Sequence, residues 1–318
     1  MPQIDVRAFR RRDREQLTSL VNAHAAAVVP GISISVATML SDLERQPDEF
    51  ITDPWVSDRV TLVADQGNRV VAAAHLLRYF ADERAGEDVR GTGEIRWLVF
   101  WPEAPAGNPY WLDATPAAEL LIAACIRQFE EWGVSSQDAG GELPVPGVYG
   151  VPEQWPHVRA LYEGAGFRHK GHTEVVHLAR VEDLPRPAGS PFEGLSVRRS
   201  VGMNGTRLSA VLGEQAVGYI EVEIFEDGER VPRHGRWADI GNLHVTGDYR
   251  RRGVATWLLG QAATWLRLAQ VTRLLDYAPL EPGPAGPDGA GYRAFLAASG
   301  FTELTRTQRG WTRGRRDR

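Results

Sequence analysis

Apolar and polar positions along the chain predict two halves with the same order of elements. Alternation at every second position predicts strands, and apolar spacings of three and four predict helices. The first half is expected to contain a strand at 4–9 followed by a helix, a second helix near 36–46, a hairpin at 59–80 turning at 65–68, a strand at 93–100, a helix near 116–132, a strand at 147–151, a helix around 157–165 and a strand at 167–178.

A segment without periodicity separates the halves. This segment, RVEDLPRPAGSPFEG at 180–194, is rich in proline and small residues, which is typical of a linker. After it we expect a strand at 195–200, a hairpin at 207–225, a strand at 236–245, a helix at 256–269, a strand at 273–277, a helix at 294–298 and a terminal strand.

The repeated order predicts an internal duplication. We expect an N-terminal domain at 1–182, a linker at 183–193 and a C-terminal domain at 194–318. One piece is missing from the second copy, because only VGMNG separates its first strand from its hairpin, where the first copy has two helices.

Composition narrows the function classes. A chain of 318 residues with 43% hydrophobic content is long enough for two globular domains. The net charge of −5 argues against a broad nucleic-acid surface, and no apolar run approaches membrane-spanning length. No secretory signal is evident at the N-terminus, so we expect a cytoplasmic protein. Cys125 is the single cysteine and is expected to be buried in a helix.

The stretch LHVTGDYRRRGVATWLLGQA, at 243–262, carries the strongest chemical signal. An apolar strand stops at a basic, glycine-containing turn, and an amphipathic helix follows. The first backbone N–H groups of a helix have no partner within it, and small residues let the backbone approach a ligand closely. The pattern therefore predicts a site for a phosphate-bearing ligand.

The run Arg250-Arg251-Arg252-Gly253-Val254-Ala255 resembles the acyl-CoA loop of the GCN5-related N-acetyltransferase (GNAT) superfamily. A second mark of that family, a helix that ends shortly before Gly-Phe, stands at 161–167 as LYEGAGF and at 295–301 as FLAASGF. The sequence is thus similar to a tandem, two-domain GNAT protein. The resemblance implies an α/β (α+β) fold in which each domain is a mixed, mostly antiparallel sheet flanked by helices.

The resemblance also implies a cofactor, acetyl-CoA or another acyl-CoA, bound by the second domain. The expected binding residues are Leu243, His244, Val245, Arg250, Arg251, Arg252, Gly253, Val254, Ala255 and Thr256. The equivalent loop of the first half, WPEAPAGNPYWLDATPAAEL at 101–120, is longer, contains several prolines and lacks arginine, so we expect no phosphate site there. No metal site is expected.

The catalytic base is the next expectation. In one branch of the family a Glu stands six residues before the valine that ends the fourth strand. With Val245 as that valine, the register offers Asp239, which would need a raised pKa to act near neutral pH. The alternative is a structural pair with Arg236. His244 is a reserve base if a β-bulge places it on the same face as Asp239.

The family's general acid is a Tyr on the helix before Gly-Phe, and here the two halves differ. Tyr162 has this position in the half without the phosphate loop, whereas Leu296 has it in the half with the loop. Tyr292, one helical turn earlier, is the candidate substitute, and simple packing is its alternative role.

We therefore expect an enzyme: an acyl-CoA-dependent N-acyltransferase, with acetyl as the acyl group, in which a primary amine of a small molecule attacks the thioester directly. The expected partner is that small-molecule amine, with no nucleic acid and no membrane, and the chain is expected to be a monomer or a homodimer. The alternative is a non-catalytic acyl-CoA-binding or regulatory protein. A purely structural duplicate would bind no acyl-CoA.

Overall fold

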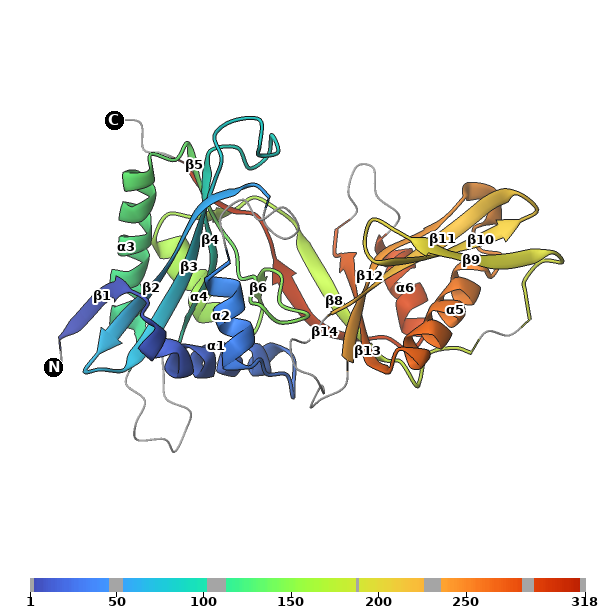
Figure 1. Ribbon diagram of the computed structural model, residues 1–318, viewed down its shortest axis with the longest axis horizontal. Coiled ribbons are helices and arrows are strands. Elements are labelled where there is room, and N and C mark those ends of the chain that lie inside the picture. The colour runs from blue at the N-terminus through green and yellow to red at the C-terminus, as the bar shows by residue number, and fades with distance from the viewer. Residues whose placement is uncertain are drawn as a thin grey trace. The chain divides into compact units, whose positions relative to one another are not determined.

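The computed structural model describes residues 3–45, 54–101, 113–186, 189–225, 236–281 and 289–314, which form two compact units (Figure 1). The first unit contains residues 1–173 and 306–318, and the second contains 174–305. Each is a mixed, mostly antiparallel sheet flanked by helices, as the sequence predicted. Among the described helices, none combines the length and apolar character needed to cross a membrane.

The sheet of the first unit has the strand order β1-β2-β3-β4-β5-β15-β7. Its strands are β1 (Ile4–Ala8), β2 (Val56–Gln66), β3 (Val70–Tyr79), β4 (Thr92–Phe100), β5 (Ser136–Ala139), β7 (Arg168–His169) and β15 (Trp311–Arg313). Its helices are η1 (Arg11–Asp13), α1 (Arg14–Val28), α2 (Val36–Leu43), α3 (Thr115–Trp132) and α4 (Pro156–Gly164).

The sheet that contains the second unit has the order β6-β14-β8-β13-β12-β11-β10-β9, and β6 (Val151–Pro152) pairs with Thr307 and Gln308 of β14, which belong to the first unit. Its strands are β8 (Thr173–Arg180), β9 (Leu195–Val201), β10 (Thr206–Leu212), β11 (Gln215–Ile224), β12 (Arg236–Val245), β13 (Val271–Pro279) and β14 (Thr302–Gln308). Its helices are η2 (Gly247–Tyr249), α5 (Val254–Leu268) and α6 (Gly289–Ala298).

Helix α5 is held by its apolar side. Its buried residues Leu258, Leu259 and Leu266 are fully inaccessible and join one core with side chains of β10 to β13. Between β9 and β10 there is only a turn, closed by a hydrogen bond from Gly202 N to Gly205 O. The described second unit therefore has no helices between its first strand and its hairpin, as the sequence predicted.

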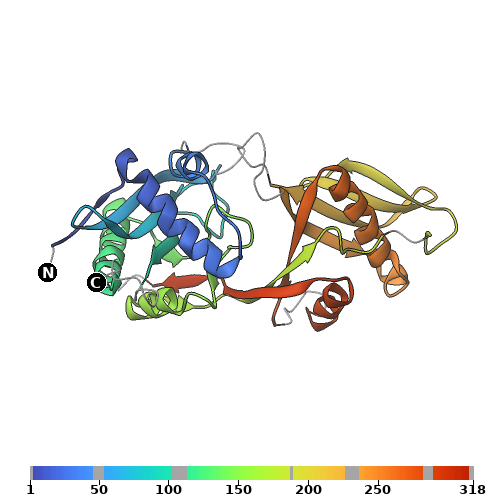
Figure 2. The same cartoon turned by 90° about the horizontal axis from the view of Figure 1, so that it is seen from below.

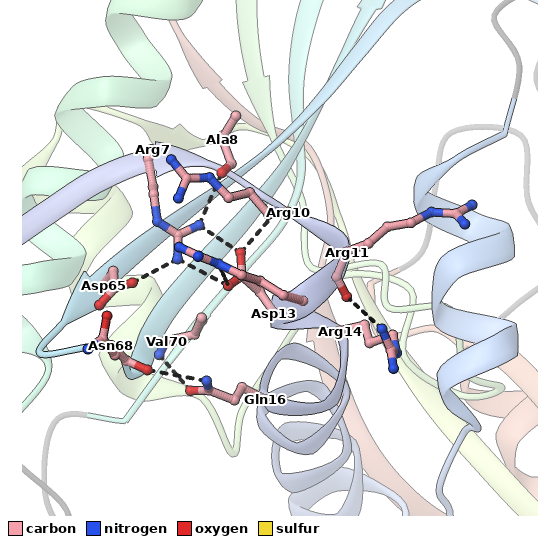
Figure 3. A network of polar contacts seen from close by, with 11 residues as sticks. Arg7, Ala8, Arg10, Arg11, Asp13, Arg14, Gln16, Asp65, Asn68 and Val70 are labelled. Carbon is pink, nitrogen blue, oxygen red and sulfur yellow. Dashed lines mark hydrogen bonds and ion pairs between the residues drawn. The ribbon is translucent and has the colours of Figure 1, made fainter.

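A buried ion pair fixes the start of the first unit (Figure 3). Arg7 on β1 donates two hydrogen bonds to Asp13, at 2.7 and 3.1 Å, and a third to Asp65 on β2 at 2.7 Å. Asp13 also accepts from Arg10 N at 2.9 Å, which holds the first turn against the strand. This network ties β1, β2 and the start of α1 together.

Each sheet is completed by a strand from the opposite half of the sequence. Strand β15 lies between β5 and β7 in the first unit, antiparallel to both, and β8 lies antiparallel to β13 in the second. Figure 2 shows the red C-terminal chain leaving β14 and ending among elements of the first unit. The units therefore do not follow the expected division at 183–193, because β8 and β15 are exchanged between the halves.

The expected strands near these exchange points differ from those observed. The parallel neighbour of β4 is β5 at Ser136–Ala139, whereas the expected strand at 147–151 contributes only Val151 to β6. The expected strand at 167–178 is two strands, β7 and β8, interrupted where Lys170 N and Gly171 N both donate to Gly310 O. A side chain at Gly171 would collide with Arg309 O, at 2.0 Å from the position of its Cβ, so the close crossing requires glycine.

Candidate functional site

The turn between β12 and α5 has the geometry of an anion-binding nest. Arg251 and Gly253 both have left-handed backbone, with φ of 56° and 86°, and they flank Arg252, whose φ is negative. Such alternation turns successive N–H groups toward one side. The first helical hydrogen bond of α5 runs from Trp257 N to Gly253 O, so the N–H groups of residues 254–256 precede it.

The three arginines of this turn have different surroundings. Arg250 donates to Val245 O at 2.9 Å and thereby fixes the turn to the end of β12. The guanidinium of Arg252 lies 4.5 Å from the centre of the Phe192 ring. Arg251 is exposed and has no hydrogen bond or ion pair with the described part of the chain. It is therefore the arginine with its donors available to a phosphate.

The helix at the equivalent place in the first unit begins differently. The carboxylate of Asp113 accepts from Thr115 N at 2.8 Å, and Pro116 has no N–H to offer. An acidic side chain thus occupies the position where an anion would bind. Of the loop at 101–120 on which the sequence argument depended, residues 102–112 lie outside the described residues.

Strand β12 lies at a split in the sheet. Its parallel pairing with β13 ends at Asp239 and Leu275, whereas its antiparallel pairing with β11 continues to Val245 and Gly218. Among the described residues, 240–245 therefore have no registered partner strand on the β13 side. This places the backbone of Leu243, His244 and Val245 next to the split, the region from which the family resemblance expects backbone N–H groups to bind the ligand.

A β-bulge at Gly241 decides which side chains of β12 share a face. The register shifts so that Ile240 lies opposite Val222 and Asn242 lies opposite Glu221, leaving Gly241 extra. Cross-strand partners point to the same side of a sheet. Asp239, opposite Glu223, therefore shares a face with His244, opposite Tyr219.

The bulge required for His244 to reach the face of Asp239 is thus present. His244 is exposed, and its ring centre lies 5.7 Å from that of Tyr219. The same face carries Glu221, whose pKa is lowered from its ordinary value by its hydrogen bond from Arg207, although burial opposes that shift. Helix α5 packs on the opposite face, and the described second unit has no helix between β9 and β10.

Asp239 has an electrostatic environment suited to proton transfer. Burial, with a smaller contribution from the neighbouring carboxylate of Glu223, raises its pKa to about 7. Its Oδ1 is buried and has no hydrogen-bond partner among the described residues. The expected alternative, an ion pair with Arg236, is not found in the described structure. A carboxyl group that titrates near neutral pH can accept a proton and release it again.

Tyr292 and Asp276 form a buried pair on the α5 side of the sheet, opposite the face of Asp239, because Asp239 pairs with Leu275 and Tyr292 packs in the core of α5. Tyr292 on α6 donates to Asp276 on β13, with 2.6 Å between the oxygens. Asp276 is 2% exposed, and burial raises its pKa to about 7, with a further contribution from Asp239. Burial and the negative Asp276 raise the pKa of Tyr292. Tyr292 therefore stays protonated near neutral pH, whereas Asp276 gains and loses its proton there.

The two residues at the family's Tyr position are both in cores. Tyr162 in the first unit is fully buried and donates to Gly140 O at 2.8 Å. Leu296 in the second unit is also fully buried.

Sequence reasoning missed Asp276. The signal was a lone carboxylate inside the apolar run VTRLLDYAP at 271–279, where a buried strand was expected. A charge at such a position is costly unless it is partnered or protonated.

The fold and the nest together define a two-unit protein with the architecture of an N-acetyltransferase. Residues 178–280 match the model of the acetyltransferase (GNAT) family. No curated protein sequence matches the chain.

Three solved structures share the fold over nearly the whole chain. A tandem GNAT protein from the clavulanic acid biosynthesis pathway, solved without AcCoA, has a TM-score of 0.64 at 16% identity, covering 99% of this chain and 100% of its own. A GNAT protein from Sphaerobacter thermophilus has a TM-score of 0.58 at 14% sequence identity, and the match covers 97% of this chain and 94% of that protein. A glucosamine N-acetyltransferase region of a fungal β-N-acetylglucosaminidase has a TM-score of 0.63 at 12% sequence identity. The match covers 98% of this chain but 38% of the fungal chain. The tandem GNAT fold is therefore shown.

The residues present fit an acyl-CoA. The nest offers backbone N–H groups beside the exposed guanidinium of Arg251, which suits a diphosphate. The split between β12 and β13 leaves backbone groups of β12 without a strand partner, which suits an extended amide-containing chain. Both features lie on the segment that matches the family.

Proposed function

We propose that the protein is an acyl-CoA-dependent N-acyltransferase that transfers an acetyl group to a primary amine of a small molecule in the cytoplasm. The observation that carries the proposal is Asp239. Its carboxyl group has a pKa of about 7 and stands on β12 at the split in the sheet, on the strand that leads into the nest.

In the proposed reaction, separate groups of the second unit bind the cofactor, accept a proton and donate one. The N–H groups of residues 253–256 and Arg251 hold the diphosphate, and backbone N–H groups of residues 243–245 orient the acyl end. The bound acyl-CoA supplies an activated acyl group as a thioester. Asp239 removes a proton from the ammonium of the acceptor, so that the neutral amine attacks. Asp276 in its protonated form, held in place by Tyr292, is the proposed source of a proton for the departing thiolate.

The test is thiol release from acetyl-CoA with a panel of small primary amines, comparing wild type with Asp239→Asn. A general base contributes roughly 10²- to 10⁴-fold to a rate, so the variant should lose about that much of kcat. Because only the ionised carboxylate accepts a proton, the wild-type rate should rise with pH below about 7 and level off above it. Glu214→Gln, an exposed change on the β10–β11 hairpin, is the matched control.

One observation favours the non-catalytic alternative. The hydroxyl of Tyr292 is aimed at Asp276, and Leu296 replaces the family's Tyr. An acyl-CoA-binding protein without activity would be stabilised by the ligand, by about 2.7 kcal/mol at 100 times Kd, and would release no thiol with any amine. A protein whose second domain is a purely structural duplicate would neither be stabilised by acyl-CoA nor release thiol from it.

A further inference from the structure

The first unit contains a cavity of about 540 Å³ that has no role in the proposed reaction. Its charged wall carries three carboxylates and two guanidinium groups, from Glu94, Asp138, Glu142, Arg96 and Arg309. Its apolar and aromatic wall includes Trp55, Val56, Tyr79, Val89, Tyr149 and Trp311. We propose that this cavity is a binding site for a small organic amine that also carries a hydrogen-bond acceptor.

Asp138 is the group that selects a cation. Arg96 forms an ion pair with Glu142 and lies 3.7 Å from Glu94, and Tyr79 donates its hydroxyl to Glu94. Asp138, by contrast, has no hydrogen bond or ion pair with its side chain among the described residues. Burial and the nearby Glu94 raise its pKa to about 6, as expected for a carboxylate that lacks a cation. An ammonium group would supply the missing partner.

A second polar group in the wall also lacks a partner. Trp311 is 1% exposed, and its indole N–H forms no hydrogen bond with any described residue. A buried donor without an acceptor is costly, and a ligand hydroxyl or carbonyl would satisfy it. Trp55, which is 47% exposed, supplies an aromatic surface of the kind that attracts ammonium groups.

The position of Glu94 agrees with a ligand site. In β4 the extra residue of a β-bulge is Arg96, since Leu76 lies opposite Ile95 and His75 lies opposite Trp97. Glu94 thus stands two residues before the bulge, as Asp239 does before Gly241 in β12. The two units place a carboxylate at equivalent points of their sheets, although at the start of α3 the side chain of Asp113 accepts a hydrogen bond from Thr115 N.

The test is calorimetric titration of the full chain with three probes that share one ring: tyramine (ammonium), tyrosol (hydroxyl) and 4-hydroxyphenylacetate (carboxylate). Serotonin, 5-hydroxytryptamine, is a second amine that also carries a hydroxyl. Wild type should bind an amine and not the neutral or anionic probe. Asp138→Asn should weaken that binding roughly ten- to a hundredfold. The variant should fold, because at neutral pH it removes a carboxylate whose charge is disfavoured by burial.

Asp239→Asn and Asp5→Asn are the controls, and both should keep amine binding to the first unit. If Asp239→Asn lost amine binding and Asp138→Asn retained it, the amine site would lie in the second unit. That result would overturn the inference and leave the proposed function unaffected. Binding of all three ring probes alike, or of neither amine at millimolar concentration, would also overturn it. The inference is independent of the acyltransferase proposal, since it involves no residue of the second unit.

Discussion

The pKa values of Asp13 and Asp239 move in opposite directions because only Asp13 faces a cation. Hydrogen bonds from Arg7 lower the pKa of Asp13 despite its burial. Asp239 is also withdrawn from water, but its charged neighbour is the carboxylate of Glu223, and its pKa rises to about 7. The same side chain is thus a permanent anion in a structural network at one position and a titrating group in the candidate active site at another.

Asp13→Asn tests the structural role. It should lower the free energy of unfolding at neutral pH by about 3 kcal/mol, because a buried guanidinium loses one of its two carboxylate partners. A carboxyl with a lowered folded-state pKa stabilises the fold above its unfolded pKa and loses that effect as pH falls. The deficit of the variant should therefore shrink below about pH 4, as measured by urea unfolding across pH.

Asp5→Asn is the control for that measurement, since it changes an exposed carboxylate on β1, the strand that carries Arg7. It should stay within about 0.5 kcal/mol of wild type. A deficit for Asp13→Asn that stays constant down to pH 2 would contradict the ion-pair explanation.

At the scale of elements, α5 begins where it does because Gly253 adopts left-handed backbone. A side chain at such a position costs about 1–2 kcal/mol, so the sequence places glycine there. Arg251 bears a similar cost without being glycine, with φ of 56°. Strain of this kind is retained where it shapes a binding site.

Gly253→Ala should therefore weaken CoA binding as well as stability. We expect a loss of about 1–2 kcal/mol in unfolding free energy and a rise in the Kd for CoA, because the strained turn relaxes and its N–H groups turn away. Differential scanning fluorimetry with and without CoA reports both effects. Gly213→Ala, at φ of 63° in the β10–β11 turn, should lose similar stability and keep its affinity for CoA. Equal affinity in both variants would argue against the nest.

Sequence patterns predicted elements with strong periodicity and failed where pairing is decided over long distances. The hairpins, α3 and α5 have regular apolar spacing, and the structure contains them all. The sequence of β5, SQDA, is short and polar, and it is a strand only because β4 lies beside it. The nest was predictable from Gly253 and its context. The partnership of Tyr292 with Asp276 was not, because it joins α6 to β13 through a side-chain contact.

At the scale of the whole molecule, the exchange of β8 and β15 makes the stability of each unit depend on residues from the other half of the sequence. Trp311→Ala should destabilise the first unit by about 3–5 kcal/mol, since this large side chain is 1% exposed. Hydrogen exchange should then accelerate in β5 and β7 but not in β12. Val176→Ala, on β8, should show the reverse pattern and affect β13.

Trp55→Ala, at a half-exposed tryptophan of the same unit, is the control and should have a smaller effect. If Trp311→Ala instead left β5 protected and accelerated exchange in β12, the exchange of strands would be contradicted.

The exchanged strand also sets the order of events during biosynthesis. Trp311–Arg313 leave the ribosome after every residue of the second unit, yet they fill the gap between β5 and β7. Domains usually fold one by one as they emerge, the N-terminal one first. Here the edge of β5 stays open until Trp311–Arg313 have left the ribosome, and a nascent chain stalled before that would present this edge to other chains.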